Sequence, residues 1–483
     1  MSAGHELDSM FYPKSVAIVG ASPNPTGWGG TSFLTRLIQL KFPGNLYPVN
    51  PKATEIQGLK AYPDVRSIPE PVDFVVVAVP AAVVPGVLED CVIAGAKNVH
   101  VFSSGFSETG EEEGRRLEEK VVEITRNGGL RLVGPNCFGI YVPASGLTHW
   151  GARPTGSGSV AFVSQSGGHG EELSDYAQGL GIHFSKIISF GNACGLQVND
   201  FLEYLAQDDD TEIITMYLEG VRDGDRFTQL VREINLTKPV IVWKGGLSDS
   251  GARAVASHTG SLAGESRMWQ AFFAQTGAIR VHSLVEIIDM VMALKYPHVP
   301  QGKRCLLLGG GGGNAVALAD IFSGEDLDVP PLSDETRRGL AEFIRLAGNS
   351  IRNPLDLWNV LDDIQLLRRC LDLVIADPVI DMVVLDRHAG SWGNEDRMRQ
   401  RELNDYIIDF AKNNIYNKPV VVAMRMLEHD PDIIAAGARL RRDFALAGVP
   451  SYSSPADAAR ALGRLVKYRE FLVESSGDKG PAR

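Results

Sequence analysis

Short apolar runs that end in glycine- or serine-rich turns recur along the whole chain. The run at 16–20 leads into a turn that begins at Gly20, the run at 160–163 leads into a serine- and glycine-rich turn at 164–168, and the run at 304–308 leads into five consecutive glycines. Amphipathic stretches separate these runs from further apolar runs. Strands that alternate with helices indicate βαβ units and parallel sheets. The pattern therefore predicts an α/β protein with doubly wound sheets.

Two linkers set the expected domain boundaries. The chain has 483 residues, enough for about three domains. Segments rich in glycine, proline and serine at 153–159 and 297–303 separate three blocks. We therefore expect a Rossmann-type domain at 1–150, flavodoxin-like domains at 151–297 and 298–474, and a disordered tail at 475–483.

Composition excludes several classes of function. The net charge of −12 disfavours a nucleic-acid partner, which needs a basic surface. Apolar runs of membrane-spanning length are absent from the sequence, and the polar N-terminus lacks the apolar core of a secretory signal. The five cysteines form no CxxC pair or Cys/His cluster. We therefore expect reduced thiols, no metal site, no membrane association and a cytoplasmic location.

The turn after the first strand indicates an anion site that differs from a dinucleotide site. Glycines from Gly20 onward allow a tight turn and close approach of a phosphate to backbone N–H groups. The spacing does not match G-x-G-x-x-G, and the second strand ends in Asn50-Pro51-Lys52 instead of an acidic residue. A lysine there suits a phosphate of coenzyme A. An NADP site or an exposed surface lysine would also explain it.

Two further strand ends belong to the same predicted crevice. Pro80 follows the third strand and Ser104 follows the fourth. Ligands of open α/β sheets bind outside the carboxyl ends of the strands. Small and polar residues at several such ends indicate a binding site there.

A histidine in a segment of small residues is the most informative feature of the second block. His258 lies between Ser257 and Thr259 in the segment 244–264, which is rich in glycine, alanine and serine and follows an apolar strand. The turn with Ser164, Ser166, Gly167 and Gly168 opens a helix and could hold an anion. Glu219 ends another strand and could fix the tautomer of an imidazole. A helix-capping or surface carboxylate is the other explanation for Glu219.

These segments resemble the ADP-forming acyl-CoA synthetases and, more distantly, the alpha subunit of succinyl-CoA synthetase. The similar stretches, which follow in the order of the family, are 134–140, 164–168, 189–192, 217–220, 244–264 and 353–356. The resemblance extends from Phe11 to about Tyr468 and implies the fold and the activity of that family.

The resemblance also implies the roles of the site residues. His258 would be transiently phosphorylated, Glu219 would orient it, and the turn at 164–168 would hold the phosphoryl group. Asn136 and Cys137 would lie near the acyl thioester. Gly20, Ser22, Lys52, Pro80 and Ser104 would line the site for coenzyme A.

The implied reaction converts acyl-CoA, ADP and phosphate into a carboxylic acid, coenzyme A and ATP. The three blocks leave no room for the family's ATP-grasp domain, so the resemblance implies an ATP-grasp beta subunit as partner, which would bring Mg²⁺ with ADP or ATP. Two alternatives are a non-catalytic CoA-binding protein of the same fold and an NAD(P)-dependent oxidoreductase. The histidine segment with Glu219 argues against the first, and the glycine spacing argues against the second.

Overall fold

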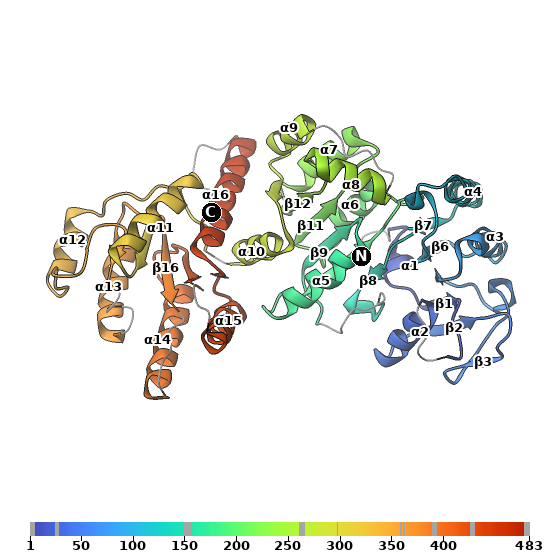
Figure 1. Ribbon diagram of the computed structural model, residues 1–483, viewed down its shortest axis with the longest axis horizontal. Coiled ribbons are helices and arrows are strands. Elements are labelled where there is room, and N and C mark those ends of the chain that lie inside the picture. Colours follow the sequence, from blue (N-terminus) through green and yellow to red (C-terminus); the bar gives the residue numbers. More distant parts are fainter. Residues whose placement is uncertain are drawn as a thin grey trace. The chain divides into compact units, whose positions relative to one another are not determined.

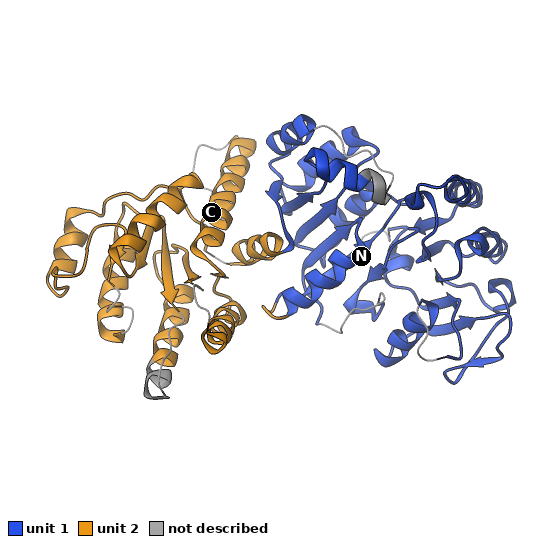
Figure 2. Ribbon diagram, in the orientation of Figure 1, with its two compact units in different colours: residues 1–178, 182–284 blue, residues 179–181, 285–483 orange. Residues whose placement is uncertain are grey.

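The structure of the 483-residue chain is a computed structural model (Figure 1). It describes residues 5–24, 29–148, 156–259, 266–296, 298–357, 360, 363–388, 394–425 and 430–477, without the side chains of 256–259 and 394–399. The chain divides into two compact units, residues 1–178 with 182–284 and residues 179–181 with 285–483 (Figure 2).

The first sheet of unit 1 is fully parallel. Its five strands in the described residues follow the order β2-β1-β5-β6-β7. They are β1 (Ser15–Val19), β2 (Asn45–Val49), β5 (Phe74–Val77), β6 (Asn98–Val101) and β7 (Arg131–Val133). The accompanying elements are α1 (Asp8–Phe11), α2 (Gly30–Gln39), the hairpin of β3 (Glu55–Ile56) and β4 (Leu59–Lys60), α3 (Val84–Ile93) and α4 (Glu112–Gly128). Every residue of β1 is buried, as expected for a strand covered on both faces.

The second sheet of unit 1 adds one antiparallel edge strand to a parallel sheet. The strands that the structure describes follow the order β13-β12-β11-β9-β10-β8, and β8 runs antiparallel to β10. They are β8 (Gly139–Tyr141), β9 (Val160–Ser164), β10 (Phe184–Ser189), β11 (Ile213–Leu218), β12 (Val240–Lys244) and β13 (Ile279–Val281). The helices are α5 (Gly167–Gln178), α6 (Val198–Gln207), α7 (Gly224–Ile234), α8 (Asp249–Thr259) and α9 (Ser266–Thr276).

A shared hydrophobic core joins the two sheets of unit 1. Ile18 and Phe33 of the first sheet layer belong to the same buried cluster as Val163 and Ile188 of the second. The sheets are therefore not separate units, although each has its own strand order.

Unit 2 contains a third parallel sheet. Within the described part of this unit the strand order is β15-β14-β16-β17-β18. The strands are β14 (Cys305–Gly309), β15 (Leu355–Asp356), β16 (Met382–His388), β17 (Val420–Arg425) and β18 (Ser451–Tyr452). The helices are α10 (Leu284–Lys295), α11 (Gly312–Gly324), α12 (Asp334–Ala341), α13 (Ile364–Ala376), α14 (Asn394–Asn413), α15 (Pro431–Leu446) and α16 (Pro455–Ser476). A buried ion pair of 3.0 Å between Asp289 and Arg441 fixes α10 to α15.

The predicted α/β class with doubly wound sheets is confirmed. In each sheet the first parallel strand lies between the second and the third, so each sheet has a point where the strand order reverses. The three predicted domain boundaries remain a prediction, because the first two sheets share one unit. No helix in the described ranges is both long and apolar enough to span a bilayer.

Candidate active site

The residues predicted to bind coenzyme A lie at one edge of the first sheet. Gly20 and Ser22 follow β1, Lys52 follows β2, Pro80 follows β5 and Ser104 follows β6. These strands are parallel neighbours in the order β2-β1-β5-β6, so their carboxyl ends share an edge. The strand order reverses between β1 and β5, where sheets of this kind bind ligands.

The turn after β1 requires a glycine at its first position. Gly20 has a φ of +96°, and a Cβ atom there would lie 2.2 Å from the carbonyl oxygen of Ala78. The backbone N–H of Ser22 donates to Thr31 Oγ1 at 3.0 Å. The turn is thus held against β5 and α2 before any ligand arrives.

Asn50 fixes the neighbouring turn, and sequence reasoning did not assign it a role. Its side-chain Nδ2 donates to the carbonyl of Ala21 at 2.8 Å, and its Oδ1 accepts from the N–H of Lys52 at 2.9 Å. The side chains of Lys52, Pro80 and Ser104 are exposed beside these ordered turns. They are available to an anionic ligand.

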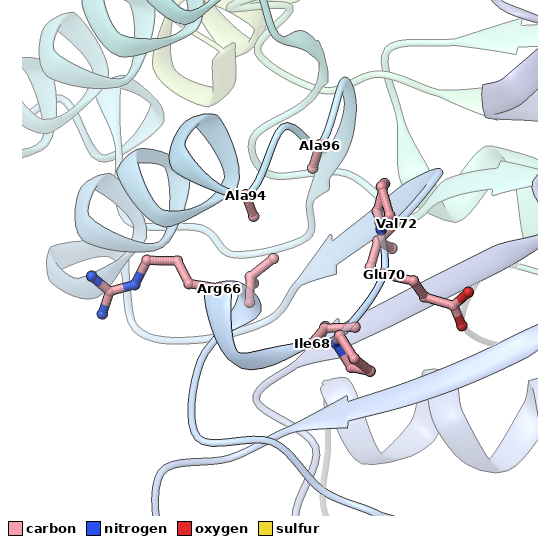
Figure 3. Close-up of a pocket in the computed structure, with 9 residues that line it drawn as sticks. Arg66, Ile68, Glu70, Val72, Ala94 and Ala96 are labelled. Atoms are coloured by element: carbon pink, nitrogen blue, oxygen red, sulfur yellow. The ribbon is translucent and has the colours of Figure 1, made fainter.

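A cavity of about 210 Å³ lies at a different place on this sheet (Figure 3). Its lining includes Ile68, Val72 and Ala96. Val72 precedes β5 and Ala96 precedes β6, so the cavity lies toward the amino ends of these strands. It does not coincide with the predicted coenzyme A site.

Asn136 and Cys137, the residues predicted to lie near the acyl thioester, belong to a loop next to the end of β6. We call this segment the acyl loop. The N–H of Asn136 donates to the carbonyl of Ser103 at 2.9 Å. Cys137 is 3% exposed, and its Sγ makes a weak 3.8 Å contact with the carbonyl of Val101. Burial raises the pKa of the Cys137 thiol, so this side chain packs as an unreactive thiol.

Asn192 holds the predicted acyl loop through its side chain, and the sequence did not reveal this role. Its Oδ1 accepts from Asn136 Nδ2 at 3.3 Å. Its Nδ2 donates to Glu108 Oε2 at 2.7 Å and to Glu118 Oε2 at 2.9 Å. Glu108 also accepts from the N–H of Gly105, beside the predicted coenzyme A residue Ser104. One network thus connects the acyl loop with the end of β6.

The predicted phosphate turn has the geometry of an anion site. Ser164 ends β9, is fully buried, donates to the carbonyl of Ser166 at 2.7 Å and accepts from its N–H at 3.1 Å. α5 begins at Gly167, and a Cβ placed on Gly168 would meet no described atom within 4 Å other than its chain neighbours and the α5 backbone. The first N–H groups of a helix lack intrahelical partners and attract anions.

The acyl loop and the phosphate turn are adjacent. The N–H of Phe138 donates to Ser189 Oγ at 3.1 Å, and Ser189 pairs with Ser164 in the sheet. The Phe138 ring lies 3.0 Å from the Cβ position of Gly167. The structure therefore brings together residues predicted to bind the acyl group and the phosphate.

Glu219 follows β11 and is 5% exposed. Its N–H and that of Gly220 both donate to Gln165 Oε1, which lies in the phosphate turn. The Tyr217 hydroxyl donates to Glu219 Oε1 at 3.2 Å. The other carboxylate oxygen, Oε2, is buried and has no hydrogen-bond partner within the part of the chain that the structure describes. The carboxylate can therefore accept one further N–H or O–H group.

Lys244 and His169 complete this edge of the second sheet. Burial lowers the pKa of Lys244 to about 8, and the Glu219 carboxylate opposes the shift. His169 lies in the first turn of α5, with its ring centroid 4.3 Å from that of Tyr217. Burial lowers the pKa of His169 against the effect of nearby carboxylates. Lys244 begins the histidine segment 244–264 and His169 directly follows the predicted phosphate turn, but the sequence gave no sign that both side chains lie near Glu219.

The side chain of His258 lies outside the described residues, as do residues 260–265. Its backbone belongs to α8, which follows β12 in the chain. The connection begins at Gly245, whose N–H donates to the carbonyl of Leu218 at 2.9 Å. The segment of His258 therefore starts at the edge that carries Glu219, and contact between the two side chains remains a prediction.

Known proteins match both parts of unit 1. Residues 14–143 match the family model described as a CoA binding domain, and residues 157–294 match the succinyl-CoA ligase like flavodoxin domain. The chain is similar to the acetyl-coenzyme A synthetase 1 of Ca. Korarchaeum cryptofilum, solved with phosphate and ADP. The TM-score is 0.82 and the identity 31%, over 98% of this chain and 99% of that one.

Sequence relatives extend over nearly the whole chain. The 4-hydroxybutyrate–CoA ligase [ADP-forming] of Nitrosopumilus maritimus is 31% identical over 96% of this chain and 64% of its own length. The subunit alpha of acetate–CoA ligase [ADP-forming] I from Pyrococcus furiosus is 35% identical over 97% of this chain and 99% of its own. The chain belongs to the family of ADP-forming acyl-CoA ligases and corresponds to their alpha subunit.

Proposed function

We propose that this alpha subunit carries the phosphoryl group of the ligase reaction on His258. One observation carries the proposal: a carboxylate oxygen of Glu219 is buried with no hydrogen-bond partner among the described side chains, and Gln165 ties the Glu219 backbone to the predicted phosphate turn. A carboxylate that accepts an imidazole N–H fixes the tautomer and leaves the other ring nitrogen free to attack phosphorus.

The proposed reaction begins with acyl-CoA on the first sheet. Gly20, Ser22, Lys52, Pro80 and Ser104 hold coenzyme A, and Asn136 and the backbone at Cys137 position the thioester. Phosphate, seated by Ser164, Ser166, Gly167 and Gly168, attacks the thioester carbonyl. The C–S bond breaks, which gives an acyl phosphate and coenzyme A.

The second step transfers the phosphoryl group to the protein. A nitrogen of His258 attacks the phosphorus of the acyl phosphate, the P–O bond to the acyl group breaks, and the carboxylic acid leaves. The phosphohistidine then passes its phosphoryl group to ADP, which gives ATP. Every step is reversible.

We propose an ATP-grasp beta subunit as the partner that binds the nucleotide with Mg²⁺. The naming of the Pyrococcus relative as a subunit alpha supports a partner, and the greater length of the Nitrosopumilus relative is consistent with a fused one. Relatives are named for acetate and for 4-hydroxybutyrate, so we propose a carboxylic acid as the substrate class. The five cysteines, all buried and free, fit a reducing cytoplasm.

Radiolabelled phosphate tests this function. The chain, purified with its nucleotide-binding subunit, is incubated with labelled phosphate and a pool of acetyl-, butyryl- and phenylacetyl-CoA. We expect an acid-labile, base-stable label on the wild type and on a His183→Ala control, and none on His258→Ala. Equal labelling of His258→Ala and the wild type would refute the assignment, and an unlabelled wild type would refute the phosphohistidine mechanism.

A further inference from the structure

Tyr217 contacts the one carboxylate on which the proposed phosphoryl transfer depends. We propose that Tyr217 is a positioning residue whose hydroxyl occupies Oε1 of Glu219 and leaves Oε2 as the acceptor for the imidazole that carries the phosphoryl group. This inference rests on the proposed function and extends it to a residue that does not touch substrate.

The position of the Tyr217 hydroxyl is defined by its surroundings. Tyr217 lies in β11 and is buried. Its ring packs against His169, with a centroid distance of 4.3 Å, and against Trp243 at 4.7 Å, both nearly edge to face. A Cβ atom on Gly245 would lie 2.7 Å from the hydroxyl oxygen. Gly245 thus provides the space that lets the hydroxyl reach Glu219.

The two oxygens of Glu219 have different surroundings. Oε1 accepts from the Tyr217 hydroxyl at 3.2 Å, whereas Oε2 is buried and meets no donor from the described residues. A buried acceptor without a partner is costly and calls for a donor that arrives during function. The Lys244 ammonium donates to the carbonyl of Gly245 and makes no hydrogen bond to Oε2.

The Tyr217 hydroxyl remains a donor throughout the working pH range. Burial raises the pKa of Tyr217, and the neighbouring Glu219 carboxylate raises it further. The phenol therefore stays protonated and keeps Oε1 engaged. A carboxylate with one oxygen held this way cannot turn freely, so the imidazole N–H meets the same oxygen in each cycle.

Removal of one hydroxyl tests the inference. Tyr217→Phe keeps the ring packing and loses only the donor to Oε1. In the complete enzyme, with the labelled phosphate and the acyl-CoA pool described above, we expect the initial rate of label transfer to fall about tenfold or more. The half-saturating concentrations of phosphate and acyl-CoA should stay unchanged, because Tyr217 binds neither.

Coupling to Glu219 separates positioning from a general structural role. In a Glu219→Gln background, Tyr217→Phe should cause no further loss, since the group through which it acts is already altered. Tyr204→Phe is the matched control, because Tyr204 is also buried and donates to a carboxylate, Asp8 at 3.3 Å. This control should label at the wild-type rate.

Gly245→Ala provides an independent second variant. The added methyl group would lie 2.7 Å from the hydroxyl oxygen and 3.1 Å from the ring carbon that carries it, so it should displace the hydroxyl and slow labelling in the wild-type background. The inference would be overturned if Tyr217→Phe labelled at the wild-type rate, or if it reduced the labelling rate equally in the wild-type and Glu219→Gln backgrounds. Either result would leave the phosphohistidine intact. Absence of label on the wild type would instead remove the proposed function and this inference together.

Discussion

Lys244 keeps an ammonium group in a place that is almost closed to water. It is 4% exposed, and its Nζ lies 5.2 Å from the centroid of the Trp269 ring. Burial lowers its pKa from 10.5 to about 8. Between these two values the unfolded chain binds the proton and the folded chain does not, so stability rises with pH across this window.

We therefore expect the wild type to gain stability relative to Lys244→Met between pH 7 and pH 9.5. The gain should be about 2 kcal/mol, at about 1.4 kcal/mol per pKa unit. Urea unfolding monitored by tryptophan fluorescence measures it. Lys60→Met, at an exposed lysine, should follow the wild type at both pH values. A Lys244→Met curve parallel to that of the wild type would show that the ammonium keeps its ordinary pKa.

Site residues marked by a local sequence pattern were predictable from the sequence. Site residues defined by long-range side-chain contacts were not. Gly20 and Ser164 directly follow apolar strands, so their position at a sheet edge follows from local sequence. Asn192 contacts Glu108 and Glu118, which are more than 70 positions away in the chain. Such long-range contacts depend on the packing of two sheets, which no local pattern contains.

At the scale of elements, a buried lysine anchors the short helix α1 to the second sheet. Lys186 of β10 is fully buried and forms a 2.7 Å ion pair with Asp208. Its Nζ also donates to the Tyr12 hydroxyl at 3.1 Å, directly after α1. The rings of Phe11 and Tyr204 lie within 6 Å of the ammonium. The ammonium is thus contacted from two elements, α1 and α6, and from the residues that directly follow them.

Removal of one charge of the Lys186–Asp208 pair should destabilise the fold far more than removal of both charges. Lys186→Met leaves Asp208 buried without its cation, and we expect a loss of about 3–5 kcal/mol in the free energy of unfolding. Asp208→Asn in the same chain should recover much of that loss. Arg226→Met is the control, because the Arg226–Glu203 pair is about 40% exposed and should cost less than about 1 kcal/mol. Equal losses of unfolding free energy in Lys186→Met and Arg226→Met, measured by urea unfolding, would contradict this account.

Long apolar strands were predictable, and the shortest strands were not. The runs that became β1, β9 and β14 are continuous and buried, which is the signature of a central parallel strand. β15 and β18 have two residues each, too few for a periodic pattern. β8 reads as glycine, isoleucine and tyrosine, and its pairing with β10 comes from the fold around it.

At the scale of the whole molecule, each of the two units contains a hydrophobic core. One buried cluster extends from Leu7 to Ala278 in unit 1, and another extends from Leu306 to Val449 in unit 2. A unit with its own core can unfold cooperatively by itself. All residues proposed to bind coenzyme A belong to unit 1, so the ligand should stabilise the two units unequally.

Calorimetry of the full chain should therefore show two unfolding transitions, and coenzyme A should raise the temperature of one of them. At 100 times its dissociation constant, a ligand stabilises the state that binds it by about 2.7 kcal/mol. Core variants assign the transitions. Ile188→Ala should lower the transition temperature of unit 1, and Leu371→Ala should lower that of unit 2. Each variant should cost about 2–5 kcal/mol in the free energy of unfolding, because both side chains are fully buried. If coenzyme A raised the transition that Leu371→Ala lowers, its site would involve unit 2. A single transition that moves with every variant would mean that the two cores unfold as one.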